Sequence, residues 1–218
     1  ASVEALELTE RYAASFDSNT TERRGTILSD SDPKYCAILD RGYKIDLPVR
    51  QTPGGAIAYF NLEDDYRLAS KTGKWLARLI WPEPDFANGP EILAMPAGKA
   101  ICLLHAIANY AELRETEVDL VVAKKEVRAV MREPIVSYSY RSVTTDRTQT
   151  LYLDADSVKK VQGKRVAIVD DVVSSGGSVE AMRSLIEQAG GTVTGIYAVF
   201  TEGGSKRGVT ALGNLPFP

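Results

Sequence analysis

The sequence has little cysteine, a single histidine and no long apolar run. Cys36 and Cys102 lie far apart and show no metal-ligand spacing, so we expect reduced thiols in a cytoplasmic protein. No stretch is apolar for long enough to cross a membrane, and no signal peptide is recognisable. His105 stands among apolar residues, and we expect it to be packed in the core rather than to act in catalysis.

The chain also lacks an excess of charge of either sign. Its net charge of −3 provides no general attraction to nucleic acid or to an acidic membrane, and we expect neither as a partner. Internal repeats and low-complexity segments are absent. A length of 218 residues with 44% hydrophobic content fits one domain of substantial size with a small appendage.

The sequence is organised around residues 166–179, which read VAIVDDVVSSGGSV. The apolar, β-branched run from Val166 to Val169 predicts a short strand buried on both faces. Asp170 and Asp171 follow at the carboxyl end of this strand, and small residues then open a helix that stops at Gly190. The stretch therefore predicts a strand, a polar loop and a helix in immediate succession.

The loop between this strand and this helix has the composition of a phosphate site. Glycine and serine let backbone N–H groups approach an oxyanion without obstruction by a Cβ atom, and the helix N-terminus adds partial positive charge. The two carboxylates are acceptors that suit sugar hydroxyls or a hydrated Mg²⁺. A sugar phosphate would satisfy both groups. The candidate phosphate-binding residues are Val173, Ser174, Ser175, Gly176, Gly177 and Ser178.

The same pattern has a plainer interpretation. A strand–loop–helix crossover needs only a helix cap, and Asp171 or Ser174 would provide one. A cap does not require paired acids, two further apolar residues and a Gly-Gly loop in this order, so we favour a ligand site. The G-x-G-x-x-G pattern of dinucleotide sites is absent.

Residues 166–179 resemble the phosphoribosyl diphosphate (PRPP) signature of type I phosphoribosyltransferases. The resemblance covers about residues 91–208 and is strongest to the purine and xanthine branch of the family. It implies that Asp170 and Asp171 serve the ribose hydroxyls and Mg²⁺, and that the following loop holds the 5′-phosphate. It also implies a homodimer.

A second strand–loop–helix unit precedes this signature. Residues 92–95 predict a buried strand, and Ala97, Gly98 and Lys99 lead into a helix over residues 100–112. Taken alone, the loop is better interpreted as a tight turn. The resemblance implies that it binds diphosphate, although an acid that the family often carries just before it is absent here.

A third buried strand, residues 119–123, ends in Lys124 and Lys125. Open α/β sheets bind ligands at the carboxyl ends of their strands, so we expect at least one of these lysines to bind diphosphate. Paired lysines are also common on protein surfaces. The segment resembles the lysine-bearing strand of xanthine-type phosphoribosyltransferases.

Residues 135–140 and 148–153 alternate in polarity and predict a long β-hairpin. One interpretation is a solvated ribbon. The family resemblance implies instead a mobile hood that closes over the reactants, so that Arg141 and Arg147 meet diphosphate oxygens.

A polar loop follows the last predicted core strand, residues 192–200, and contains Glu202. In 6-oxopurine relatives a lysine commonly lies near this position and donates to the oxo group of the base. A carboxylate accepts hydrogen bonds instead, so we expect Glu202 to face the base and a 6-oxopurine not to be the best acceptor. The alternative is that Glu202 points to solvent. Residues 211–218 are interpreted as a short tail.

The N-terminal part of the chain has a different texture. It predicts short elements separated by turns, namely a helix within residues 1–24, strands at 26–28, 43–47 and 56–60, and a helix over 63–81. We expect residues 1–90 to form a flanking hood and residues 91–218 to form the PRPP-binding core.

Together these elements predict an α/β fold: a doubly wound, mostly parallel sheet with an inserted β-hairpin and a small N-terminal hood. The resemblance implies transfer of the 5-phosphoribosyl group from Mg²⁺-PRPP to a ring nitrogen of a purine-like base, with release of diphosphate. Lys125 and Arg141 would join Asp170 and Asp171 in catalysis. The alternative is a regulatory protein that senses PRPP or a nucleotide without catalysis.

Overall fold

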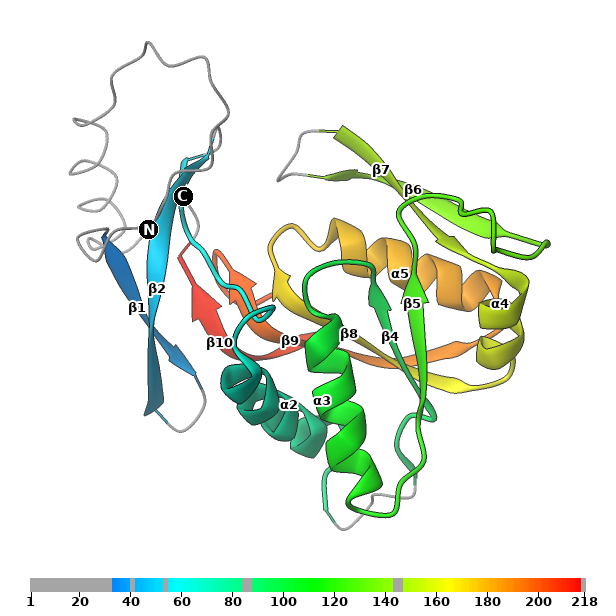
Figure 1. The fold of residues 1–218 in the computed structure, drawn as a ribbon, viewed down its shortest axis with the longest axis horizontal. Helices are drawn as coiled ribbons and strands as arrows, with labels where there is room; N and C mark the ends of the chain where they lie inside the picture. Colours follow the sequence, from blue (N-terminus) through cyan, green and yellow to red (C-terminus); the bar gives the residue numbers. More distant parts are fainter. Residues whose placement is uncertain (1–32, 40–41, 53–54, 84–87, 143–146, 217–218) are drawn as a thin grey trace.

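The structure is a computed structural model that describes residues 33–39, 42–52, 55–83, 88–142 and 147–216 (Figure 1). The helix predicted within residues 1–24 and the strand predicted at 26–28 lie outside these residues. Over the described ranges, no helix has the length and apolar character needed to span a membrane. Cys36 and Cys102 are both free thiols.

A sheet of eight strands forms the centre of the described molecule, in the order β3-β2-β1-β10-β9-β8-β4-β5. The strands from β10 to β5 in this order are parallel to one another, whereas β1, β2 and β3 are antiparallel and join the sheet through β10. The bounds are β1 (Lys34–Leu39), β2 (Tyr43–Thr52), β3 (Gly55–Ala58), β4 (Ile92–Pro96), β5 (Asp119–Ala123), β8 (Arg165–Val173), β9 (Thr192–Glu202) and β10 (Val209–Leu215).

Helices cover both faces of the parallel strands. On one face lie α2 (Tyr66–Ile80) and α3 (Ile101–Glu112), and on the other lie α4 (Ala155–Val161) and α5 (Gly177–Gln188). Successive residues of β8 alternate between the two layers, because Ala167 and Val169 pack in the core with α2 and α3, while Ile168 packs with α5. This alternation explains why the strand reads as a continuous apolar run.

The predicted hairpin is present as a separate two-stranded sheet of β6 (Val136–Ser142) and β7 (Arg147–Leu153). It packs against α5, and an isolated bridge between Lys124 and Tyr152 ties it to the end of β5. Leu151 and Leu153 are buried in the core beneath α5. The hairpin therefore stands over the carboxyl ends of the parallel strands.

The fold class is confirmed, and so are most of the predicted elements between residues 43 and 200. Three interpretations are wrong. β8 does not end before the paired acids but continues through them to Val173, where it still pairs with Thr201 of β9. The predicted tail contains β10, which pairs with β9. His105 is exposed on α3 rather than packed in the core.

Two elements, β1 and α4, were not predicted. The predicted helix over residues 63–81 is α2, which begins later because the Asp65 side chain accepts a hydrogen bond from the Leu68 N–H at 2.9 Å and caps it. α2 packs beside α3 in the same core layer. The division into a hood of residues 1–90 and a core of residues 91–218 stays a prediction.

Candidate functional site

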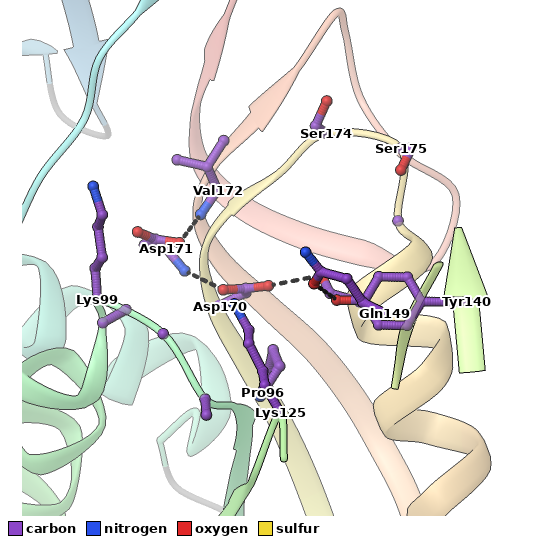
Figure 2. A pocket seen from close by; sticks show the side chains of 15 residues that line it. Pro96, Lys99, Lys125, Tyr140, Gln149, Asp170, Asp171, Val172, Ser174 and Ser175 are labelled. Atoms are coloured by element: carbon purple, nitrogen blue, oxygen red, sulfur yellow. Dashed lines mark hydrogen bonds between the residues drawn. The ribbon is translucent and has the colours of Figure 1, made fainter. Parts of the chain in front are cut away.

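A cavity of about 470 Å³ lies at the carboxyl ends of β4 and β8, which is a volume typical of small-molecule sites (Figure 2). It brings together the two predicted loops, the paired acids, one of the two lysines and part of the hairpin. Its lining residues are Pro96, Ala97, Gly98, Lys99, Ala100, Lys125, Tyr140, Gln149, Asp170, Asp171, Val172, Ser174, Ser175, Gly176 and Ser178.

The loop from Ser174 to Gly176 connects β8 to α5 and forms one wall of the cavity. Gly176 is the N-cap of α5 and has a φ of +85°, a left-handed conformation that glycine adopts without steric cost. The first intrahelical bond runs from the Glu180 N–H to the Gly176 carbonyl at 3.0 Å. The amide groups of the first turn therefore lie at the end of the helix that faces the cavity, where an anion is favoured.

The paired acids occupy the last part of β8 and are held by short local hydrogen bonds. Asp170 accepts from the Asp171 N–H at 3.0 Å and from the Ser178 hydroxyl at 3.2 Å. Asp171 accepts from the Val172 N–H at 2.9 Å. Burial, and next the neighbouring charge of Asp171, raise the pKa of Asp170 well above its usual range. Within the pair, Asp170 is therefore the carboxyl group whose protonated form is favoured.

The second loop follows β4 and faces the acids across the cavity. The Ala97 N–H donates to the Ala123 carbonyl at 2.7 Å, which fixes the start of the loop against the end of β5. The ammonium of Lys99 is hydrogen-bonded to the hydroxyl of Tyr59, and this bond is the main reason that the pKa of Lys99 is raised. The charge of Asp171 also raises it, so the lysine and the acid act on each other across the site.

The two lysines after β5 are separated by the structure. Lys125 lines the cavity, whereas Lys124 does not. The backbone of Lys124 bonds that of Tyr152 in both directions, at 2.9 and 2.8 Å. Burial alone would raise the pKa of Asp154. Hydrogen bonds from Ser157 and the positive charge of Lys124 lower it instead. Of the two lysines, Lys125 is therefore the one placed on the cavity.

The hairpin contributes Tyr140 and Gln149, which sequence reasoning missed. The two residues are paired in register, and the Tyr140 hydroxyl donates to Gln149 Oε1 at 2.9 Å (Figure 2). Burial, and next the charge of Asp170, raise the pKa of Tyr140. The sequence signal that pointed toward these two residues was the alternation of the hairpin strands, because it places every second residue on the face toward α5.

Several predicted site residues are not among those that line the cavity. Val173 is buried, Gly177 lies behind the loop against the hairpin, and Arg141 is exposed. Glu202 is the last residue of β9 and is half-buried. Arg147 begins β7, but its side chain lies outside the described parts of the structure.

The chemistry of this site bears on Mg²⁺ binding. Among the described residues, no group of three or more histidine, cysteine or acidic side chains could hold a metal ion. Mg²⁺ commonly binds through one or two carboxylates together with phosphates of the substrate. Asp170 and Asp171 therefore fit an ion that arrives with a diphosphate, rather than one that resides in the protein.

The fold and the cavity define a doubly wound α/β protein, a class that binds its ligands at the carboxyl edge of a parallel sheet. A more specific assignment comes from comparison with known families. The model of the phosphoribosyl transferase domain family matches residues 63–210, and the chain belongs to this family.

Individual relatives agree with this assignment. The chain is 29% identical over 167 residues to the purine biosynthesis transcriptional repressor of Bacillus subtilis, covering 76% of this chain and 54% of that protein. It is 30% identical over 132 residues to an adenine phosphoribosyltransferase of Mycobacterium tuberculosis, covering 61% of this chain and 57% of that protein. The chain thus spans about half the length of these curated relatives.

Solved structures show the same fold. The adenine phosphoribosyltransferase of Thermoanaerobacter pseudethanolicus superposes with a TM-score of 0.56 at 22% identity, covering 72% of this chain and 84% of that chain. At this level of identity the likeness establishes the fold alone.

Proposed function

We propose that the protein transfers the 5-phosphoribosyl group of PRPP to a ring nitrogen of a purine base and releases diphosphate. The observation that carries this proposal is the convergence of two small-residue loops, the paired acids and Lys125 on one cavity. Membership of the phosphoribosyl transferase domain family and similarity to adenine phosphoribosyltransferases support it. Adenine is therefore the first base to test.

Each part of the cavity has a role in this reaction. The loop from Ser174 to Ser178 would bind the 5′-phosphate through backbone amides and hydroxyl groups. Asp171, and Asp170 once it has lost its proton, would accept hydrogen bonds from the ribose hydroxyls. Fixing the sugar in this way presents its C1 carbon to the base and substitutes positioning for covalent catalysis.

The leaving diphosphate would lie on the opposite side of the cavity. Ala97, Gly98 and Lys99 would bind it together with Lys125, and Mg²⁺ would enter as part of the substrate. Positive charge at this place stabilises the charge that develops as the bond between C1 and diphosphate breaks. Arg141 is proposed to join when the hairpin closes and shuts out water.

A homodimer and a cytoplasmic location belong to the same proposal. The base would be recognised by Glu202 and by the region of residues 1–90.

The decisive experiment is to incubate the protein with Mg²⁺-PRPP and adenine, guanine, hypoxanthine or xanthine, and to measure diphosphate and nucleotide. We expect diphosphate and nucleotide in equal amounts with at least one base. PRPP binding detected by calorimetry without product from any base would contradict catalysis.

A second candidate function is a PRPP-sensing regulator that does not catalyse transfer. It is favoured by the match to a transcriptional repressor over 76% of this chain. It is also consistent with the apolar residue Met95 at the end of β4, where the family often carries an acid. Tight PRPP binding without turnover in the experiment above would establish this alternative.

A further inference from the structure

The outer side of α2 carries a row of cations. Arg67, Lys71, Lys74 and Arg78 are separated by four, three and four positions, a spacing that places them on one side of a helix. All four are exposed, and α3, which lies beside α2, is followed by the exposed residue Arg114 (Figure 1). These five side chains are called the α2 ridge below. None of them lines the cavity, so the inference is independent of the proposed function.

Three cations of the ridge gather around one tyrosine. Lys74 Nζ and the Arg78 guanidinium each lie 5.9 Å from the ring centroid of Tyr110, and that of Arg114 lies 5.5 Å from it. Arg78 Nε and Arg114 Nη2 also donate to the Tyr110 hydroxyl, at 3.2 and 3.1 Å. Arg114 in addition forms an ion pair with Glu83 at 2.6 Å. The tyrosine thus fixes the positions of three positive groups.

The remaining two cations are also held by aromatic rings. Lys71 Nζ lies 3.9 Å from the ring centroid of Tyr43, and the Arg67 guanidinium lies 5.9 Å from that of Tyr66. Within the part of the chain that the structure describes, no ion pair joins a carboxylate to any of the four α2 cations. An aromatic face attracts a cation but does not neutralise it, so the four α2 cations of the ridge keep their charge.

We propose that the α2 ridge binds the phosphate backbone of a double-stranded nucleic acid. Like charges held close together repel one another, and an anion relieves this repulsion. Arginine and lysine are the residues that proteins use to contact phosphates. The net charge of −3 excludes a general attraction to nucleic acid but not a local one.

The geometry favours this partner over other anions. Eleven residues of helix between Arg67 and Arg78 correspond to about 16 Å, the rise of roughly five base pairs. A small phosphorylated ligand would need a concave site, and the cavity includes none of the ridge. A second copy related by two-fold symmetry would place cations opposite cations. Because the rings are engaged by the cations, contacts to the backbone are favoured over base stacking.

The test uses the full chain and a fluorescein-labelled duplex DNA of 24 base pairs with random sequence, with binding followed by anisotropy between about 50 and 200 mM KCl. The variant is Lys74→Glu with Arg78→Glu. The matched control is Lys34→Glu with Lys159→Glu, which makes the same charge change at exposed positions elsewhere. Lys74→Gln with Arg78→Gln provides a milder pair, and circular dichroism verifies the fold of each.

We expect the wild-type protein to bind at low salt and the ridge variant to lose at least tenfold in affinity. Removing two phosphate contacts should also reduce the slope of log affinity against log salt by about two. The control should remain within twofold of wild type. Wild-type protein that does not bind at about 50 mM KCl, or folded ridge variants that bind as wild type, would overturn the proposal. Displacement of the DNA by polyglutamate at equal charge would also overturn it, because an acidic protein would then be the partner.

Discussion

The ring of Tyr140 on β6 packs against Gly177, the first residue of α5. A Cβ atom at Gly177 would lie 3.0 Å from Tyr140 Cδ2 and 3.3 Å from the Arg141 carbonyl oxygen. The hairpin thus rests directly on the helix whose N-terminus follows the loop that we propose to bind phosphate. A side chain at position 177 therefore requires the Tyr140 ring or the Arg141 backbone to shift.

Gly177→Val should therefore weaken PRPP binding at least tenfold while the core stays folded. The branched side chain opposes the tyrosine ring and a backbone carbonyl, and only the ring can swing aside. Gly177→Ala should have a smaller effect, and part of it should disappear in a Tyr140→Ala background. Calorimetry on the four proteins of this cycle measures the coupling. Unchanged affinity in a folded Gly177→Val protein would disprove this role of the contact.

Asp170→Asn should raise stability at neutral pH but not at low pH. The pKa of Asp170 is raised because burial, and next Asp171, disfavour its ionised form. The unfolded chain loses the Asp170 proton above about pH 3.9, whereas the folded protein keeps it to a higher pH. The free energy of unfolding therefore falls as the pH rises between these two pKa values. The difference in Tm, variant minus wild type, should be near zero below that pH and become positive toward pH 7. PRPP-dependent activity should fall by orders of magnitude, and a variant less stable at every pH would show a structural role.

The two lysines after β5 should differ in their effect on PRPP. Lys125 lines the cavity, whereas Lys124 is tied to β7 through its backbone and acts on Asp154. We expect Lys125→Ala to weaken PRPP binding about tenfold or more, since a hydrogen bond to a charged group contributes about 1.5–3 kcal/mol. Lys124→Ala is the matched control and should change affinity less than threefold. If calorimetry shows the same loss of PRPP affinity in both variants, Lys125 is not the lysine that selectively binds PRPP.

The hairpin should gain protection when substrate binds. Outside its bridge to Lys124 it forms its own small sheet, and Ser139, Tyr138 and Arg141 are exposed. In hydrogen exchange, the amides of residues 138–141 and 148–150 should exchange faster than those of β8 in the free protein. They should slow on addition of Mg²⁺-PRPP, with β9 as the internal reference. The same rates with and without substrate would indicate a static ribbon.

Glu202 should disfavour an oxo group on the base. Its carboxylate accepts hydrogen bonds, so it would suit an amino group or a ring N–H and oppose an oxo group. We expect adenine to be preferred over hypoxanthine and xanthine, and Glu202→Lys to shift the preference toward the oxo bases. Competition kinetics with the four purines measures this ranking. Preference for hypoxanthine or xanthine, with no shift in Glu202→Lys, would show that Glu202 does not contact the base.

Local sequence patterns were sufficient for the loops that line the cavity. The loop between β8 and α5 consists of residues next to one another in the chain, so its glycine and serine content alone predicts a loop at this place. The end of β8 was not predictable in the same way. Asp170 and Asp171 have low strand propensity, yet they remain in the strand because β9 continues alongside, with Asp170 opposite Ala198 and Val173 opposite Thr201.

Elements that depend on distant partners were missed for a related reason. The segment of β10 contains glycine and asparagine and reads as a tail, but Val209 pairs with Ile196 and the strand is held by β9. Tyr140 and Gln149 entered the site because their strands cross over the cavity, which hairpin periodicity alone does not reveal. Charge drew attention to Arg141, whereas the cavity is lined by the neutral residue beside it.

The pairing of β1 with β10 has a consequence for how the protein is made. Leu39 is opposite Gly213, so the antiparallel strands of the sheet attach to a strand that is synthesised much later. At about 5–20 residues per second, the ribosome would deliver β10 roughly ten to thirty seconds after β1. During nascent-chain growth, β1 to β3 have no sheet to join, and their exposed edge is open to chaperones or to mispairing. If translation stopped before Val209, strands β1 to β3 would lack the strand that joins them to the rest of the sheet.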